Sequence, residues 1–187
     1  MADPDAARDL YRDWAATYDD DVFATLGFTG SDRIAELLAE HLPGRDGPVL
    51  DLGCGTGAVG VRLTELGFTT IDGVDLSAEM VELAAAKGVY RRLTVLDLTA
   101  TELELPAGHA GLVSAGTFTT GHVGPEVVPR LLDLLARGGV VAWVIGVDVW
   151  PAFEPVLERS PLEMLHRDLE PIRRDGGPEG VMFVARS

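Results

Sequence analysis

A glycine-rich stretch, 51–57 (DLGCGTG), has the composition of a ligand-binding turn between a strand and a helix. It follows the short apolar run 48–52 and precedes a helix-period pattern that ends at Gly67. Gly53 and Gly55 let the chain turn sharply and let a ligand approach bare backbone. The first N–H groups of the following helix attract a negative group such as a carboxylate. Three glycines at alternate positions exceed what a plain turn requires, so the stretch predicts a binding site.

Two classes of ligand fit this loop, and Asp51 separates them. Gly53, Gly55 and Ala58 match the dinucleotide fingerprint G-x-G-x-x-[GA], which is typical of nicotinamide-dependent oxidoreductases. Asp51 precedes the first glycine by two residues, where its carboxylate would crowd and repel a pyrophosphate. The same carboxylate suits an ammonium group. S-adenosylmethionine carries an ammonium, a sulfonium and a carboxylate but no phosphate, so it is the ligand that we expect.

Two more aspartates follow later apolar runs and extend this site. Asp75 lies 24 residues after Asp51, near the spacing of an acid that accepts from ribose hydroxyls. Asp97 follows the next apolar run and could accept from an adenine amino group, while the Leu98 N–H donates to the ring. Each aspartate alone would be interpreted as a helix-entry or turn residue. Their common position after successive strands, where ligands collect in parallel sheets, favours the binding site.

The segments that position these residues alternate between strand and helix patterns. Apolar runs predict strands at 48–52, 69–75, 93–96, 110–114 and 140–147, and a closing antiparallel hairpin at 168–174 and 180–186. Helices are predicted at 5–19, at 32–41 after a Ser31 cap, from Val59 to Leu66, from a Ser77 cap to Gly88, from Pro125 to Gly138, and at 152–166, with 19–21 as a solvated turn. This alternation predicts an α/β fold with a parallel sheet covered on both faces.

Length and composition fit one globular domain of 187 residues, with 1–45 as a helical cap and 46–187 as a cofactor-binding core. There are 15 basic and 30 acidic residues, a net charge of −15, which disfavours nucleic acid and acidic membrane surfaces as partners. No apolar run approaches the roughly 18 residues of a membrane span. The single cysteine, Cys54, suits a reducing cytoplasm, and no histidine has metal-ligand spacing with it. We expect a cytoplasmic protein without a metal, monomeric or homodimeric.

Together these motifs resemble a known family. The stretches 51–57 (DLGCGTG), 74–77 (VDLS) and 96–98 (LDL) are similar to those of class I S-adenosylmethionine-dependent methyltransferases. Three more stretches resemble the Williams–Beuren-region methyltransferase-like proteins, within the group that includes the ubiquinone and menaquinone methyltransferases: 11–19 (YRDWAATYD), 71–80 (IDGVDLSAEM) and 114–125 (SAGTFTTGHVGP). The resemblance extends from about residue 8 to the end of the chain.

The resemblance implies a fold, a cofactor and a set of site residues. The fold is a Rossmann-like, doubly wound sheet of seven strands in the order 3-2-1-4-5-7-6, with strand 7 antiparallel and a helical cap before it. The cofactor is S-adenosylmethionine, with S-adenosylhomocysteine as its product, and Tyr11 and Tyr18 cap it from the N-terminal helix. The candidate cofactor-binding residues are Tyr11, Tyr18, Asp51, Gly53, Cys54, Gly55, Gly57, Asp75, Leu76, Met80, Asp97, Leu98 and Ser114.

The stretch after the fourth predicted strand bears on the methyl acceptor. Enzymes that methylate nucleobase amines usually carry Asn/Asp-Pro-Pro-aromatic there, whereas this chain has 114–117 (SAGT) and contains no asparagine. With the acidic surface, this favours a small-molecule acceptor. A cofactor-binding module without activity remains an alternative, beside the oxidoreductase.

One histidine and the cysteine are the remaining candidates for chemistry. His122 follows the fourth predicted strand in a Thr/Gly-rich loop and is the candidate general base, if the acceptor must lose a proton. Its alternative role is a local hydrogen bond in that loop. Cys54 is either a small filler of the glycine loop or a thiol activated by the helix N-terminus.

Overall fold

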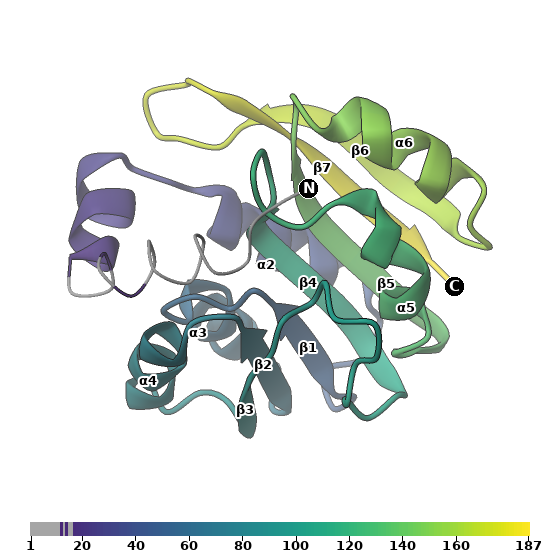
Figure 1. Ribbon diagram of the computed structural model, residues 1–187, viewed down its shortest axis with the longest axis horizontal. Coiled ribbons are helices and arrows are strands. Elements are labelled where there is room, and N and C mark those ends of the chain that lie inside the picture. Colours follow the sequence, from purple (N-terminus) through teal and green to yellow (C-terminus); the bar gives the residue numbers. More distant parts are fainter. Residues whose placement is uncertain (1–11, 13, 15–16) are drawn as a thin grey trace.

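The computed structural model describes Arg12, Trp14 and residues 17–187, and its centre is one seven-stranded sheet (Figure 1). The strands are β1 (Val49–Leu52), β2 (Ile71–Asp75), β3 (Arg92–Val95), β4 (His109–Phe118), β5 (Leu135–Gly146), β6 (Glu163–Pro171) and β7 (Glu179–Arg186). They lie in the order β3-β2-β1-β4-β5-β7-β6. β7 is antiparallel to β5 and β6, and the other neighbours are parallel. The expected fold class and strand order are confirmed.

Helices cover both faces of the sheet and form two apolar layers (Figure 1). They are α2 (Gly30–His41), α3 (Ala58–Glu65), α4 (Ala78–Ala86), α5 (Val128–Leu132) and α6 (Trp150–Glu158). On one face Ile34 of α2 packs in the same layer as Leu63 of α3. On the other face Leu131 of α5 and Phe153 of α6 pack with Trp143 of β5. All five side chains are fully buried, so both layers contribute to the hydrophobic stabilisation of the sheet.

The side chains of β1 alternate between these two layers. Leu50 and Leu52 belong to the layer under α5 and α6, and Val49 belongs to the layer under α2 and α3. Because successive side chains of a strand point to opposite faces, Asp51 lies on the same side as Val49. β1 pairs with β2 so that Asp51 lies opposite Gly73. Asp51 is therefore next to a strand position that has no side chain.

Two predicted helices are shorter in the structure than their sequence patterns. The helix expected over 152–166 ends at Glu158, and β6 takes up the residues from 163 because they pair with β7. The helix expected from Pro125 to Gly138 ends at Leu132, since β5 already begins at Leu135 beside β4. In both cases pairing within the sheet overrides a local helical period.

The segment before α2 also differs from its sequence pattern. Residues 19–21, expected as a solvated turn, enter a short π-helical segment, Asp20–Thr25. α2 begins at Gly30 after Thr29, so Ser31 is a buried residue of its first turn and not its cap. α2 packs against β4 and β5, so this part of the expected cap belongs to the core layer.

Backbone hydrogen bonds join this N-terminal segment to the connection between β6 and β7. The Thr29 N–H donates to the Ile172 carbonyl over 2.9 Å, and the Arg174 N–H donates to the Gly27 carbonyl over 2.9 Å. Phe28 lies between these two bonds. The connection therefore fixes the place of Phe28, which forms an isolated antiparallel β-bridge with Arg173.

Candidate cofactor site

The glycine-rich loop 53–57 turns from β1 into α3 through backbone conformations that glycine adopts without strain. Gly53 has φ +67° and Gly55 has φ +52°. A Cβ at Gly53 would also collide with Thr117, whose hydroxyl donates to the Leu52 carbonyl over 2.9 Å. A Cβ at Gly55 would meet no atom within 4 Å. The loop therefore presents bare backbone to open space, as its composition predicts.

A cavity with two carboxylates, which we call the acidic cavity, opens where β1 to β4 end. Most of the predicted site residues line it: Tyr18, Gly53, Gly55, Asp75, Leu76, Met80, Asp97, Leu98 and His122. They come from five separate segments of the chain, and parallel pairing brings the strand ends among them to one edge of the sheet. The structure thus assembles these residues around one cavity, while their contacts with a cofactor stay predictions.

Asp75 holds the glycine-rich loop in place in addition to facing the acidic cavity. Its Oδ2 accepts from the Gly55 N–H over 2.8 Å, and its Oδ1 accepts from the Ser77 N–H over 2.9 Å. Burial raises the pKa of Asp75, and the Ser77 and Gly55 N–H donors oppose that rise. A carboxylate offers about four acceptor positions, so two bonds leave capacity for ribose hydroxyls. Ser77 also caps α4 as expected, because its hydroxyl accepts from the Met80 N–H over 3.2 Å.

The part of the acidic cavity that lies beyond β3 combines the carboxylate of Asp97 with apolar walls. Asp97 Oδ1 accepts from the Thr99 N–H over 2.8 Å and from the Thr99 hydroxyl over 2.6 Å. These bonds fix the direction of the carboxylate after β3. Met80 and Leu98 are buried and line the same cavity. This end could therefore hold a flat ring between apolar side chains with one acceptor at its edge.

A second cavity adjoins the first and has aromatic walls from the N-terminal segment. Tyr18, Phe23 and Phe28 line it, and we call it the aromatic cavity. Their ring centroids are 6.3 Å apart for Tyr18 and Phe23, and 6.4 Å apart for Phe23 and Phe28. Sequence analysis missed Phe23 and Phe28, because backbone hydrogen bonds to the β6–β7 connection fix Phe28, whose N–H in turn donates to the Val22 carbonyl beside Phe23. Both cavities share Tyr18, Gly53, Gly55, Ala115 and Gly116.

Asp51, on which the choice of ligand depends, is fully buried beneath the loop and lines neither cavity. Its Oδ2 accepts from the Tyr90 hydroxyl over 2.7 Å. In the described part of the chain, no donor is within hydrogen-bond distance of its buried Oδ1. Burial raises the pKa of Asp51 to about 7, opposed by the Tyr90 hydroxyl and assisted by the negative charge of Asp75. Contact of Asp51 with a ligand stays a prediction.

Four other predicted residues have different places. Cys54 lines the aromatic cavity, and burial, followed by the charges of Asp51 and Asp75, raises the pKa of its thiol, which fits a filler and not a reactive cysteine. Ser114 lines neither cavity, and its hydroxyl donates to the Leu52 carbonyl over 2.8 Å. Gly57 precedes α3 with φ +96°. Tyr11 lies outside the described residues.

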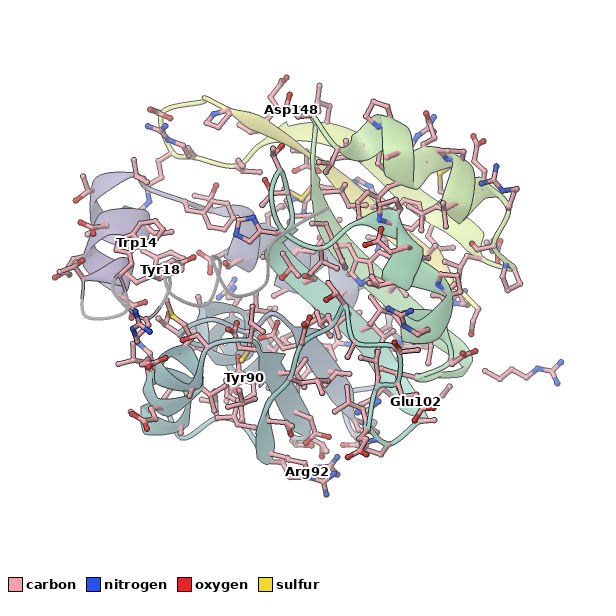
Figure 2. All side chains as sticks on the ribbon, in the orientation of Figure 1. Trp14, Tyr18, Tyr90, Arg92, Glu102 and Asp148 are labelled. Carbon is pink, nitrogen blue, oxygen red and sulfur yellow. The ribbon has the colours of Figure 1, made fainter. Side chains whose placement is uncertain are left out.

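Asp19 ties the N-terminal segment to the loop, a contact that sequence analysis did not anticipate. Its Oδ1 accepts from the Thr56 hydroxyl over 2.5 Å, and its Oδ2 accepts from Lys87 Nζ over 2.8 Å. Lys87 is the only lysine in the chain. Because Tyr18 precedes Asp19, these two contacts help to place the tyrosine, which lines both cavities. Figure 2 labels Tyr18 beside Trp14 on the N-terminal segment.

His122 lines the acidic cavity on the loop after β4. Its Nδ1 lies 3.1 Å from the Thr120 carbonyl oxygen, so the neutral ring with a proton on Nδ1 would donate to that oxygen. This local contact orients the imidazole and leaves its action as a base a prediction.

The described residues give no sign of a metal centre or of a membrane span. Among them, no group of three or more His, Cys, Asp or Glu side chains is placed to hold a metal ion. In the same part of the chain, no helix has both the length and the apolar composition to cross a bilayer.

Comparison with known proteins identifies the fold. Residues 49–139 match the methyltransferase domain family. The structure also matches the 1,6-didemethyltoxoflavin-N1-methyltransferase of Burkholderia thailandensis, which was solved with 1,6-didemethyltoxoflavin and S-adenosylhomocysteine bound. The TM-score is 0.72 at 22% identity, over 100% of this chain and 91% of the other. The chain has the class I S-adenosylmethionine-dependent methyltransferase fold.

Two human proteins resemble the chain in sequence. Methyltransferase-like protein 27 is 36% identical over 143 residues, which are 74% of this chain and 58% of that protein. EEF1A lysine methyltransferase 2 is 27% identical over 128 residues, which are 60% of this chain and 54% of that protein. The chain therefore spans little more than half the length of these relatives.

Proposed function

We propose that the chain transfers a methyl group from S-adenosylmethionine to a small-molecule acceptor. The observation that carries this proposal is the acidic cavity, where Asp75 and Asp97 follow neighbouring strands and face bare glycine backbone. Neither cavity has a lysine or arginine among its described lining residues. Such walls suit a ligand with hydroxyls, an amino group and positive charge. The pyrophosphate of a nicotinamide cofactor would face carboxylates without a cationic partner.

The residues present fit this cofactor part by part. Asp75 would accept from ribose hydroxyls, and Asp97 would accept from the adenine amino group beside the apolar side chain of Met80. The backbone of Gly55 has open space before it. The buried Oδ1 of Asp51 is an acceptor with no donor among the described residues, which supports a cationic group near the loop. When bound, the cofactor would supply an electrophilic methyl group.

The aromatic cavity is the proposed acceptor site. It meets the acidic cavity at the shared backbone of Gly53, Gly55, Ala115 and Gly116, which is where the methionine end of the cofactor would lie. The walls of Phe23 and Phe28 favour an uncharged, largely apolar or aromatic acceptor. The small acceptor of the matching Burkholderia enzyme is consistent with this choice.

Catalysis in this proposal depends mainly on how the chain orients its two ligands. Well-oriented pairs reach effective molarities of about 10⁵–10⁸ M, so placing the acceptor in line with the methyl group accounts for much of the rate. Tyr18 lies on both cavities and would close the site over the junction. His122 would take a proton from the acceptor where the nucleophile carries one.

Calorimetric titration with S-adenosylhomocysteine and S-adenosylmethionine tests the cofactor directly. We expect both to bind, because both carry the ammonium, ribose and adenine groups, whereas NADH and NADPH should not bind. Absence of binding below about millimolar would reject the proposal. Release of S-adenosylhomocysteine with a panel of phenols, thiols and nitrogen heterocycles tests the acceptor class, and a His122→Gln variant should lower turnover while it leaves the affinity for S-adenosylhomocysteine unchanged.

The finer assignments rest on sequence features alone. We propose that the chain is closest to the Williams–Beuren-region methyltransferase-like group because of the stretches 11–19, 71–80 and 114–125. The single cysteine supports a cytoplasmic location. The net charge of −15 supports a small-molecule partner over nucleic acid.

A further inference from the structure

Tyr90, between α4 and β3, reaches beneath the glycine-rich loop (Figure 2). Its ring fills space that three glycines leave by having no side chain. A Cβ at Gly73 of β2 would lie 2.9 Å from the ring atom Cε1, and a Cβ at Gly57 would lie 3.1 Å from Cε2. A Cβ at Gly60 of α3 would overlap the ring. The tyrosine therefore joins β2, the loop and the start of α3 at a place where only glycines admit it.

The hydroxyl of Tyr90 links the helix start to the buried aspartate. It accepts from the Gly60 N–H over 3.2 Å and donates to Asp51 Oδ2 over 2.7 Å. The Gly60 N–H belongs to the first turn of α3, whose N–H groups have no partner within the helix. A hydroxyl that accepts one hydrogen bond donates a stronger one. The positive end of α3 is thus coupled to the carboxylate under the loop.

We propose that Tyr90 is a positioning residue of the cofactor site, which fixes the Asp51 carboxylate under the loop and, by donating to it, favours its charged form toward the cationic end of S-adenosylmethionine. This inference rests on the proposed function. Because one hydroxyl occupies Oδ2, the other oxygen, Oδ1, remains an acceptor without a donor among the described residues. Tyr90 acts through Asp51 and lines neither cavity itself.

The charges around Asp51 determine what removal of the hydroxyl would do. The pKa of Tyr90 is raised well above its ordinary value, first by burial and then by the charge of Asp51, so its hydroxyl stays a donor. Asp75 faces the same region and adds repulsion. The Tyr90 hydroxyl is the side-chain donor that opposes these effects on Asp51. Without it the pKa of Asp51 rises above about 7, and the aspartate is largely neutral at neutral pH.

The test is the affinity of the full chain for S-adenosylhomocysteine, measured by calorimetry at pH 6, 7, 8 and 9 for the wild type and for Tyr90→Phe. We expect the variant to bind about tenfold more weakly at pH 6, about fivefold more weakly at pH 7 and within about threefold of the wild type at pH 9, because a rise of about one pKa unit lowers the ionised fraction about tenfold only below both pKa values. The ratio of the two affinities cancels the titration of the ligand itself. Asp51→Asn should bind weakly, and its affinity should change over this pH range only through the titration of the ligand.

A structural role alone would give a different result. If Tyr90→Phe lowered the affinity by the same factor at every pH, the positioning role would be wrong. The double variant Tyr90→Phe/Asp51→Asn should bind as Asp51→Asn does, and it also removes the uncompensated carboxylate should Tyr90→Phe alone fail to fold. Ser160→Ala, which removes a hydroxyl that donates to Leu157 far from the cavities, is the matched control and should show no change. Failure of the wild type to bind at any pH would instead reject the proposed function.

Discussion

Asp75 and Asp51 end neighbouring strands of one sheet, yet the structure gives them opposite environments. Asp75 faces the acidic cavity and holds the Gly55 N–H, whereas Asp51 is fully buried and holds the Tyr90 hydroxyl. In the parallel register Asp51 lies opposite Gly73, so Asp75 stands two residues, roughly 6–7 Å, further along the sheet. That difference places one carboxylate in the cavity and the other beneath the loop.

The comparison shows that a carboxylate at a strand end has two ways to serve a binding site. Asp75 is placed to bind a ligand through direct hydrogen bonds, and Asp51 is placed to act through its charge across the glycine loop. The first role depends on the geometry of the hydrogen bonds. The second depends on ionisation, because burial brings the pKa of Asp51 to about 7.

The largest effect is expected from Asp75→Ala, which removes the carboxylate that is proposed to contact the ligand directly. It removes the proposed acceptor for ribose and also leaves the Gly55 and Ser77 N–H groups without their partner. We expect the affinity for S-adenosylhomocysteine to fall by more than tenfold, since a hydrogen bond to a charged group contributes about 1.5–3 kcal/mol. Calorimetry measures this loss. Asp168→Asn, which removes one exposed charge from β6, should change the affinity by less than about twofold.

The next largest effect is expected from Asp51→Asn, which tests the buried carboxylate through the pH dependence of folding stability in the absence of ligand. The pKa of Asp51 in the folded protein is about 7, above its unfolded value of about 3.9, so the folded state holds the extra proton and loses stability as pH rises from about 4 to 7. Asparagine does not titrate. As pH rises from 5 to 8, the free energy of unfolding of the variant should therefore increase relative to that of the wild type. The change should be at most about 1.4 kcal/mol per pH unit, and it should level off above pH 7. Urea unfolding measures both free energies, and a constant difference between variant and wild type across this range would contradict the raised pKa of Asp51.

A variant in the aromatic cavity should weaken acceptor binding without changing cofactor binding. Phe23→Ala removes one wall of that cavity and leaves the acidic cavity intact. With an acceptor found in the panel, we expect its KM to rise by roughly tenfold, the equivalent of about 1.4 kcal/mol of lost apolar burial. The affinity for S-adenosylhomocysteine should stay within about twofold. Leu26→Ala is the matched control, since its exposed side chain lines neither cavity, and an equal effect from it would reject the assignment.

The smallest effect is expected from loss of the ion pair that ties the N-terminal segment to the end of α4. Lys87→Met removes the ion pair with Asp19, whose side chains are 38% and 43% exposed. Exposed pairs contribute about 0.2–1 kcal/mol and are screened by salt. We expect a loss of affinity for S-adenosylhomocysteine of about twofold to threefold in 20 mM salt, and little difference in 0.5 M salt. A salt-independent loss would show that the segment is held by other contacts.

The β1-to-α3 region shows how far sequence could reach. Alternate glycines in 51–57 and the aspartates after successive strands were sufficient to predict the loop and the strand ends, and Gly53, Gly55, Asp75 and Asp97 line the acidic cavity. These features are local, and parallel pairing brings strand ends together whatever their side chains. By contrast, residues 152–166 had a helical period in sequence, but residues 163–166 belong to β6, which pairs with β7.

What sequence did not reveal are contacts between segments far apart in the chain. Tyr90 meets Asp51 across 39 residues, and Phe28 is fixed beside the connection between β6 and β7. Neither contact produces a periodic pattern in the sequence. Tyr90 depends on space that glycines of other segments leave open, and Phe28 depends on backbone groups of the β6–β7 connection. Gly73, opposite Asp51, is such a space, but its meaning is visible only once β1 and β2 are in register.

The sequence by itself determined the order of strands and helices, the need for glycine at Gly53 and Gly55, and the positions of acids at strand ends. Only the tertiary structure decided that Asp75 faces the cavity while Asp51 lies beneath the loop with Tyr90, and that aromatic rings from the N-terminal segment form the second cavity. The physical reason is that periodicity fixes the face on which a side chain lies, whereas its depth and partners depend on strand register and on which other segments pack there.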